Sequence, residues 1–237
     1  MRPDETEALH DETDRVRQRY ARRAARGPEW RYDPLNPVNL CMIQERERLL
    51  ADLLRRNLGR PAGAARLIEI GCGNGFNLLS LLRLGFHPEN LTANELLEDR
   101  LAAARSRLPA TVRFLPGDAT RLDVEPGSQD VVFQSTVFSS LLDDDFQVRL
   151  AERMWEWVRP GGAVLWYDLA YGNPRNPDVR GMPAPRVRAL FPQGRCTVRR
   201  VTLAPPLARR APAALYGLLN ATPLLRTHLL CWIAKPL

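Results

Sequence analysis

The chain has 237 residues, 45% of them hydrophobic, which suffices for one substantial core or one domain with an added lid. No apolar run approaches the roughly eighteen residues that a membrane-spanning helix needs, so we expect no membrane partner. The polar, acidic start lacks the features of a secretion signal, which predicts a cytoplasmic protein. The four cysteines are scattered, so we expect no metal site.

The formal net charge of +7 arises in the C-terminal quarter of the chain. Residues 179–237 contain ten basic residues and no acidic residue, whereas the first 178 residues have a balance of −3. This stretch could bind an acidic substrate, a protein partner or RNA. It could also reflect composition alone, because 33 of the 34 basic residues are arginine. We favour composition and do not expect a nucleic-acid partner.

The first predicted element is a charged helix over residues 11–25, with Val16, Tyr20 and Ala24 at helical spacing. This helix either packs one apolar edge on the domain or acts as a lid over a bound ligand. A connection broken by prolines is expected over residues 30–40.

A second, amphipathic helix is predicted over residues 41–58, with several Glu/Arg pairs facing solvent. A Gly- and Pro-containing break follows it. We therefore divide the chain into an N-terminal helical lid or cap segment, residues 1–60, and a main domain, residues 61–237.

The main domain opens with a short apolar strand that runs into a glycine-rich turn. The pattern is Glu69-x-Gly71-x-Gly73-x-Gly75, and a helical pattern begins immediately after it. Glycines at such a turn let the main chain approach a ligand closely. An acid within the turn would repel a diphosphate, but it suits a ligand that carries an ammonium group and no phosphate.

Further strands follow at regular intervals. Residues 91–95 predict a strand that ends in Glu95, and such an acid either accepts hydrogen bonds from ribose hydroxyls or begins the next helix. Residues 112–116 predict a third strand and residues 129–135 a buried fourth. In residues 157–167 we expect the end of a helix, an Arg-Pro-Gly-Gly turn and a fifth strand.

In this order, the motifs resemble those of the Rossmann-like, class I S-adenosylmethionine (SAM) dependent methyltransferases of the small-molecule type. The resemblance covers residues 64–170 well and the flanks weakly. It implies an α/β fold with a doubly wound, mostly parallel seven-stranded sheet, an antiparallel last strand and N-terminal helices. This chain departs from the family by a helical insertion, residues 205–223, before the last strand; the insertion could form a substrate cap or a dimer surface.

The resemblance also implies SAM as the cofactor and a set of residues around it. In the family, an aromatic residue of the opening helix covers the cofactor, and the acid of the Gly-Asp-Ala segment takes the adenine amino group. The cofactor-binding residues implied are Tyr20, Glu69, Gly71, Cys72, Gly73, Gly75, Asn77, Glu95, Leu96, Asp118, Ala119, Gln134 and Ser135.

Candidates for catalysis lie at the end of the fifth strand. Asp168, with Tyr167 and Tyr171, is the best candidate for deprotonating or orienting a substrate hydroxyl, although a turn carboxylate is an equally good interpretation of Asp168. The fourth strand lacks the Asn/Asp-Pro-Pro-Tyr signature, which argues against methylation of base amino groups. The acids at 143–145 are expected to cap a helix rather than to bind a metal.

We therefore expect a methyltransferase acting on a small-molecule acceptor. Residues 36–40, 45–48 and 173–177 resemble a bacterial methyltransferase group linked to glycans and specialised metabolites, which suggests a hydroxyl acceptor of that kind. Two alternatives stay open. One is an RNA or protein methyltransferase that uses the basic C-terminal region, and the other is a SAM-fold accessory subunit acting with a partner enzyme on a SAM-derived intermediate.

Overall fold

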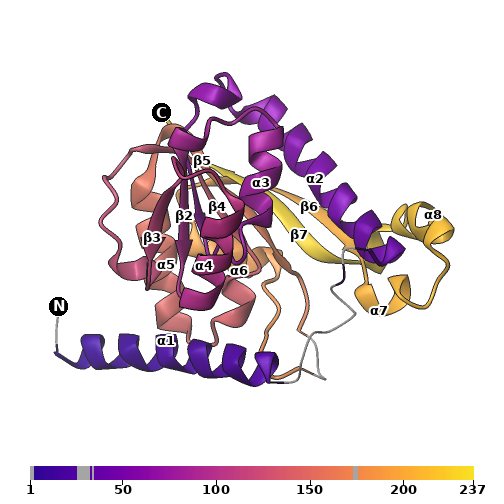
Figure 1. The fold of residues 1–237 in the computed structure, drawn as a ribbon, viewed down its shortest axis with the longest axis horizontal. Helices are drawn as coiled ribbons and strands as arrows, with labels where there is room; N and C mark the ends of the chain where they lie inside the picture. The colour runs from indigo at the N-terminus through magenta and orange to yellow at the C-terminus, as the bar shows by residue number, and fades with distance from the viewer. Residues whose placement is uncertain (1–2, 26–32, 34, 173–175) are drawn as a thin grey trace.

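The computed structural model describes residues 3–25, 33, 35–172 and 176–237, and side chains from residue 12 onward. Its centre is a seven-stranded sheet in the order β3-β2-β1-β4-β5-β7-β6 (Figure 1). β7 runs antiparallel to β5 and β6, and the remaining neighbours are parallel. The strands are β1 (Leu67–Ile70), β2 (Leu91–Glu95), β3 (Arg113–Pro116), β4 (Gln129–Ser135), β5 (Val158–Leu169), β6 (Arg195–Leu203) and β7 (Arg226–Ala234).

Helices cover both faces of this sheet (Figure 1). Alternate residues of a strand point to opposite faces, so Leu67 packs with one helical layer and Ile68 with the other. The helices are α1 (Pro3–Ala24), α2 (Pro37–Asn57), α3 (Phe76–Arg83), α4 (Glu98–Arg107), α5 (Asp144–Trp157), α6 (Ala184–Leu190), α7 (Pro205–Ala208) and α8 (Tyr216–Asn220). Buried residues of α2, α3 and α4 pack on one face, and those of α5 and α6 on the other.

The predicted fold class is confirmed, including the antiparallel last strand and the helical insertion, which forms α7 and α8. No helix among the described residues is both long and apolar enough to cross a membrane.

Two local predictions were wrong. α2 begins at Pro37 instead of residue 41, because proline is well tolerated in the first helical turn and the Asn36 side chain accepts a hydrogen bond from the Val38 N–H. The expected Arg-Pro-Gly-Gly turn is part of β5, which starts directly after α5. The pairing with β4 shifts register here: Gln129 pairs with Val158 and Val131 with Ala163, so β5 contains more residues than β4 between the two pairs.

Glu45 of α2 is buried, although several Glu/Arg pairs of this helix were expected to face solvent. Its carboxylate accepts hydrogen bonds from the Thr202 N–H at 3.1 Å and from the Tyr216 hydroxyl at 2.5 Å. These contacts join α2 to β6 and to α8 of the insertion. The insertion therefore packs on the N-terminal segment, as the position of α8 beside the start of α2 in Figure 1 shows.

We expect Glu45→Ala to lower the free energy of unfolding by about 2–4 kcal/mol, because two buried donors lose their acceptor. Chemical denaturation followed by circular dichroism measures this change. Gln44→Ala, at an exposed position of the same helix, is the matched control and should stay within about 0.5 kcal/mol of the parent. Equal stability of the two variants would contradict the anchoring role of Glu45.

Candidate functional site

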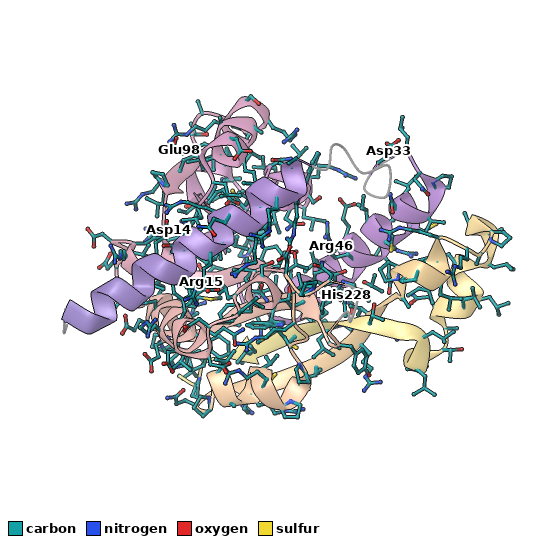
Figure 2. The ribbon with its side chains drawn as sticks, turned by 90° about the horizontal axis from the view of Figure 1, so that it is seen from below. Asp14, Arg15, Asp33, Arg46, Glu98 and His228 are labelled. Carbon is teal, nitrogen blue, oxygen red and sulfur yellow. The ribbon has the colours of Figure 1, made fainter. Side chains whose placement is uncertain are left out.

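A cavity of about 450 Å³ lies at the carboxyl ends of β1, β2 and β4. Ligands of open α/β folds bind at this edge of the sheet. Residues of α1 and α2 complete the wall of the cavity, so the N-terminal segment contributes directly to the site. Figures 1 and 2 show α1 lying across one end of the sheet.

The floor of the cavity is the glycine turn between β1 and α3. Gly71 and Gly73 both have positive φ angles, 63° and 55°. A Cβ atom on Gly71 would come within 2.6 Å of the Val137 side chain, so this position is closed by packing. A Cβ atom on Gly73 would meet nothing within 4 Å. The main chain at Gly73 is therefore left open to a ligand.

Glu95 connects the end of β2 to this turn. One carboxylate oxygen accepts the Gly73 N–H at 2.8 Å, and the other accepts the N–H groups of Leu96 and Leu97 at 2.9 and 3.0 Å. Three main-chain donors hold the carboxylate in one orientation at the cavity wall. They leave about one of the four or so lone-pair sites of the carboxylate free for a ligand hydroxyl.

The loop after β3 is fixed in a similar way. Asp118 accepts hydrogen bonds from the N–H and the hydroxyl of Thr120 at 2.8 and 2.9 Å. From β2, the Asn94 amide donates to the carbonyls of Leu115 and Gly117. Asp118 therefore reaches the cavity from a rigid loop.

Glu69, at the end of β1, lies directly behind the cavity wall and is fully buried. One of its oxygens accepts a hydrogen bond from the Asn77 amide at 2.6 Å, and the other has no partner. Burial raises the pKa of this carboxyl to about 8, against the weaker opposing effects of Asn77 and Arg46. Glu69 is therefore mostly protonated at neutral pH in the ligand-free protein.

Tyr20 of α1 forms part of the cavity wall, with the Arg100 guanidinium 4.3 Å from its ring centroid. A buried ion pair fixes this part of α1: Arg19 contacts Glu12 at 2.7 Å and also donates to the Ser140 carbonyl. Glu12 in turn accepts the Leu142 N–H. The helix is thus anchored to the segment that follows β4.

Most of the predicted cofactor-binding residues meet at this cavity. Those in its wall are Tyr20, Gly71, Cys72, Gly73, Asn77, Glu95, Leu96, Asp118, Ala119 and Ser135. Three others, Glu69, Gly75 and Gln134, do not line it. Gln134 is buried and its side-chain oxygen accepts the Val137 N–H.

The predicted catalytic residues do not line the cavity. Asp168 is fully buried and accepts the N–H groups of Ser139 and Leu169. Burial raises its pKa to about 6. The Tyr167 hydroxyl lies 2.9 Å from that of Thr202, and Tyr171 is 47% exposed. The geometry thus favours the turn-carboxylate interpretation of Asp168, and a catalytic role for any of the three lacks geometric support.

Two parts of the wall were missed in the sequence. Arg46 of α2 lines the cavity, although several Glu/Arg pairs of this helix were expected to face solvent. The segment of residues 136–140 after β4 also contributes, and Thr136 adopts a positive φ of 59°. Nothing in the local pattern of α2 distinguishes Arg46 from the exposed Gln44 and Arg48. The segment after β4 could have been expected in the wall, because it leaves the ligand-binding edge of the sheet.

Known proteins are similar to this chain in sequence and in fold. Residues 67–162 match the family model described as "Methyltransferase domain". A malonyl-[acyl-carrier protein] O-methyltransferase from Bacteroides fragilis is 40% identical over 94 residues, which cover 39% of this chain and 19% of the relative. A ubiquinone biosynthesis O-methyltransferase from Ruegeria pomeroyi is 28% identical over 172 residues, which cover 70% and 66%. The chain thus spans less than two thirds of the length of these relatives.

Among solved structures, the Burkholderia thailandensis 1,6-didemethyltoxoflavin-N1-methyltransferase, bound to 1,6-didemethyltoxoflavin and S-adenosylhomocysteine, aligns with a TM-score of 0.60. The alignment covers 100% of this chain and 91% of the other at 18% identity, and it shows a shared fold. Residues 67–162 thus match a methyltransferase domain, and the chain shares its fold with solved methyltransferases.

The raised pKa of Glu69 predicts a pH-dependent effect of Glu69→Gln in the ligand-free protein. In wild type, the folded carboxyl keeps its proton up to about pH 8, whereas the unfolded one loses it near the ordinary glutamate pKa of 4.5. Folding stability is therefore lost as pH rises through this window. Glu69→Gln lacks this loss, so its stability relative to wild type should rise between pH 5 and 8 in urea titrations.

The exposed Glu98 provides the control for this titration. Glu98→Gln removes a carboxyl at an exposed position and should show no comparable rise between pH 5 and 8. A Glu69→Gln difference that is equally constant would mean that the carboxyl is ionised in the folded protein.

Proposed function

We propose that this protein is a SAM-dependent methyltransferase that transfers a methyl group to an oxygen atom of a small-molecule acceptor. The observation that carries the proposal is the pairing of the Glu95 carboxylate with the open Gly73 main chain in one cavity at the ligand-binding edge of the sheet. The oxygen acceptor is supported by two curated relatives that are named O-methyltransferases.

Different residues of the cavity would bind different parts of the cofactor. Glu95 would accept a hydrogen bond from a ribose hydroxyl, and Asp118 would face the adenine amino group. Gly73 would leave room for the amino-acid part of the cofactor, and Asn77 in the cavity wall would lie near its ammonium group. SAM supplies a methyl group that is already activated on a sulfonium.

The protein's own contribution to the reaction is positioning. The cavity residues would hold SAM so that its methyl group faces the acceptor oxygen, and SAM would give up the methyl and leave as a neutral thioether that keeps the electron pair of the broken carbon–sulfur bond. Orienting the two reactants can lower the barrier by about 7–11 kcal/mol. A hydroxyl acceptor also releases its proton; a carboxylate needs no base.

The finer assignment, a hydroxyl of a glycan or of a specialised metabolite, rests on sequence segments alone. One of them, residues 173–177, lies partly outside the described residues. Four further proposals also come from the sequence alone: a lid role for residues 1–60, a homodimer, a partner enzyme and a cytoplasmic location.

The alternatives have weaker support. Several arginines of the basic C-terminal region serve the fold itself: Arg180 and Arg186 contact Asp144, and Arg199 contacts Asp52. Such pairing accounts for part of the charge without RNA. An accessory subunit without turnover is disfavoured by the intact glycine turn and its acid.

Gly73→Val and Glu95→Ala should each abolish or strongly weaken S-adenosylhomocysteine binding, by about 100-fold or more. Valine would fill the open face of the turn in a strained backbone, and alanine removes the carboxylate. Isothermal titration calorimetry measures the affinities, with the exposed Glu98→Ala in the next helix as control. Wild-type protein that gives no heat with S-adenosylhomocysteine would reject the proposal.

Tyr20→Ala should weaken S-adenosylhomocysteine binding about tenfold, because the ring covers one side of the cavity. Tyr20→Phe should be nearly neutral, since the hydroxyl makes only a 3.5 Å contact with Ser140. Calorimetry at constant temperature separates the two. Unchanged binding by Tyr20→Ala would argue that α1 packs on the domain without acting as a lid.

A further inference from the structure

Arg46 is a cation in the cavity wall without a partner that matches its charge. Its Nε atom is buried and has no hydrogen-bond partner. Its guanidinium lies 5.4 Å from the centroid of the Tyr167 ring. Among the residues that the structure describes, no carboxylate forms an ion pair with it. The partly buried guanidinium of Arg46 thus faces the cavity without an ion pair, where an anionic ligand can bind it.

The fold holds Arg46 in this position. Consecutive residues of an α-helix point about 100° apart, so the orientation of Glu45 sets that of its neighbour. Glu45 is fixed by Thr202 and Tyr216 on one side of α2, which directs Arg46 to the cavity side. In Figure 2, Arg46 and His228 lie near each other in the space between α1 and α2.

The groups that face Arg46 leave its charge uncompensated at neutral pH. Burial lowers the pKa of His228 to about 4, so the imidazole is neutral. Burial also raises the pKa of Tyr167 and raises that of Glu69 to about 8, which keeps both mostly protonated. Arg46 is therefore the charged side chain that lines this end of the cavity among the described residues.

This end lies away from the acids assigned to the nucleoside. Glu95 and Asp118 follow β2 and β3, whereas Arg46 lies over Tyr167 of β5 and near His228 of β7. In the sheet order, β1 and β4 separate the two groups. The cofactor adds a net positive charge of its own, because sulfonium and ammonium outweigh its one carboxylate. An anionic acceptor would balance both.

We propose that the acceptor carries a carboxylate and that Arg46 binds it. This assignment rests on the proposed function and narrows its substrate class to small carboxylic acids. A guanidinium presents paired N–H donors that match the two oxygens of a carboxylate, which fixes orientation as well as charge. Arg46 is thus a specificity-determining and positioning residue, and it transfers no proton.

The test measures binding of benzoate and succinate, and of their primary amides, to protein saturated with S-adenosylhomocysteine. Ligand-observed NMR gives the affinities for wild type, Arg46→Met, Arg46→Lys and the control Arg48→Met at an exposed position of the same helix. We expect a carboxylate to bind and its amide not to. Arg46→Met should weaken that binding about tenfold or more, Arg46→Lys should weaken it less, and Arg48→Met should leave it unchanged.

A second arm compares S-adenosylhomocysteine with 5′-methylthioadenosine, which lacks the carboxylate, on the ligand-free protein. We expect Arg46→Met to bind both as wild type does. If it loses affinity for S-adenosylhomocysteine alone, Arg46 binds the cofactor's own carboxylate and the proposal is wrong. Equal binding of amides and carboxylates, or binding of neither, also overturns it. Wild type that fails to bind S-adenosylhomocysteine would instead reject the proposed methyltransferase function.

Discussion

The hydrogen bond from the Gly73 N–H to the Glu95 carboxylate is the constraint on which the cavity depends. It ties the turn after β1 to the end of β2 and so sets the width of the opening between the two strands. The same carboxylate also accepts hydrogen bonds from the N–H groups of Leu96 and Leu97, the two residues that precede α4. One side chain therefore shapes the turn, begins a helix and presents an anionic surface to the cavity.

A second polar group holds the opposite side. Glu45, Thr202 and Tyr167 are linked through hydrogen bonds that cross from α2 to β6 and β5. Thr202 adopts a positive φ of 61°, a conformation that a threonine takes only when its surroundings demand it. The network connects the N-terminal segment, the last strands and the insertion, which local sequence gives no reason to associate. The network affects the site indirectly, because it fixes which side of α2 faces the cavity.

The contrast between these two sides explains which features could be predicted. The strand of residues 129–135 is the observed β4 because a buried parallel strand is a continuous apolar run with clear limits. Gly71, Gly73 and Glu95, predicted to bind the cofactor, line one cavity because their positions follow from adjacent strand ends. The burial of Glu45 could not be predicted, because its partners lie 157 and 171 residues away. Asp168 was expected at the site since it ends β5, yet the loop after β4 supplies donors that turn it inward.

The distribution of charge in the cavity brings these observations together. Carboxylates that stay fixed by main-chain donors, as Glu95 and Asp118 are, gather on the β2 and β3 side. On the β5 and β7 side Tyr167 and His228 are neutral at neutral pH, and Arg46 is the cation that lines the cavity there. A low-dielectric surrounding strengthens the attraction of such a cation for an anion that reaches it. The cavity thus differs in charge between its two ends, as the proposed positions of the nucleoside and of an anionic acceptor require.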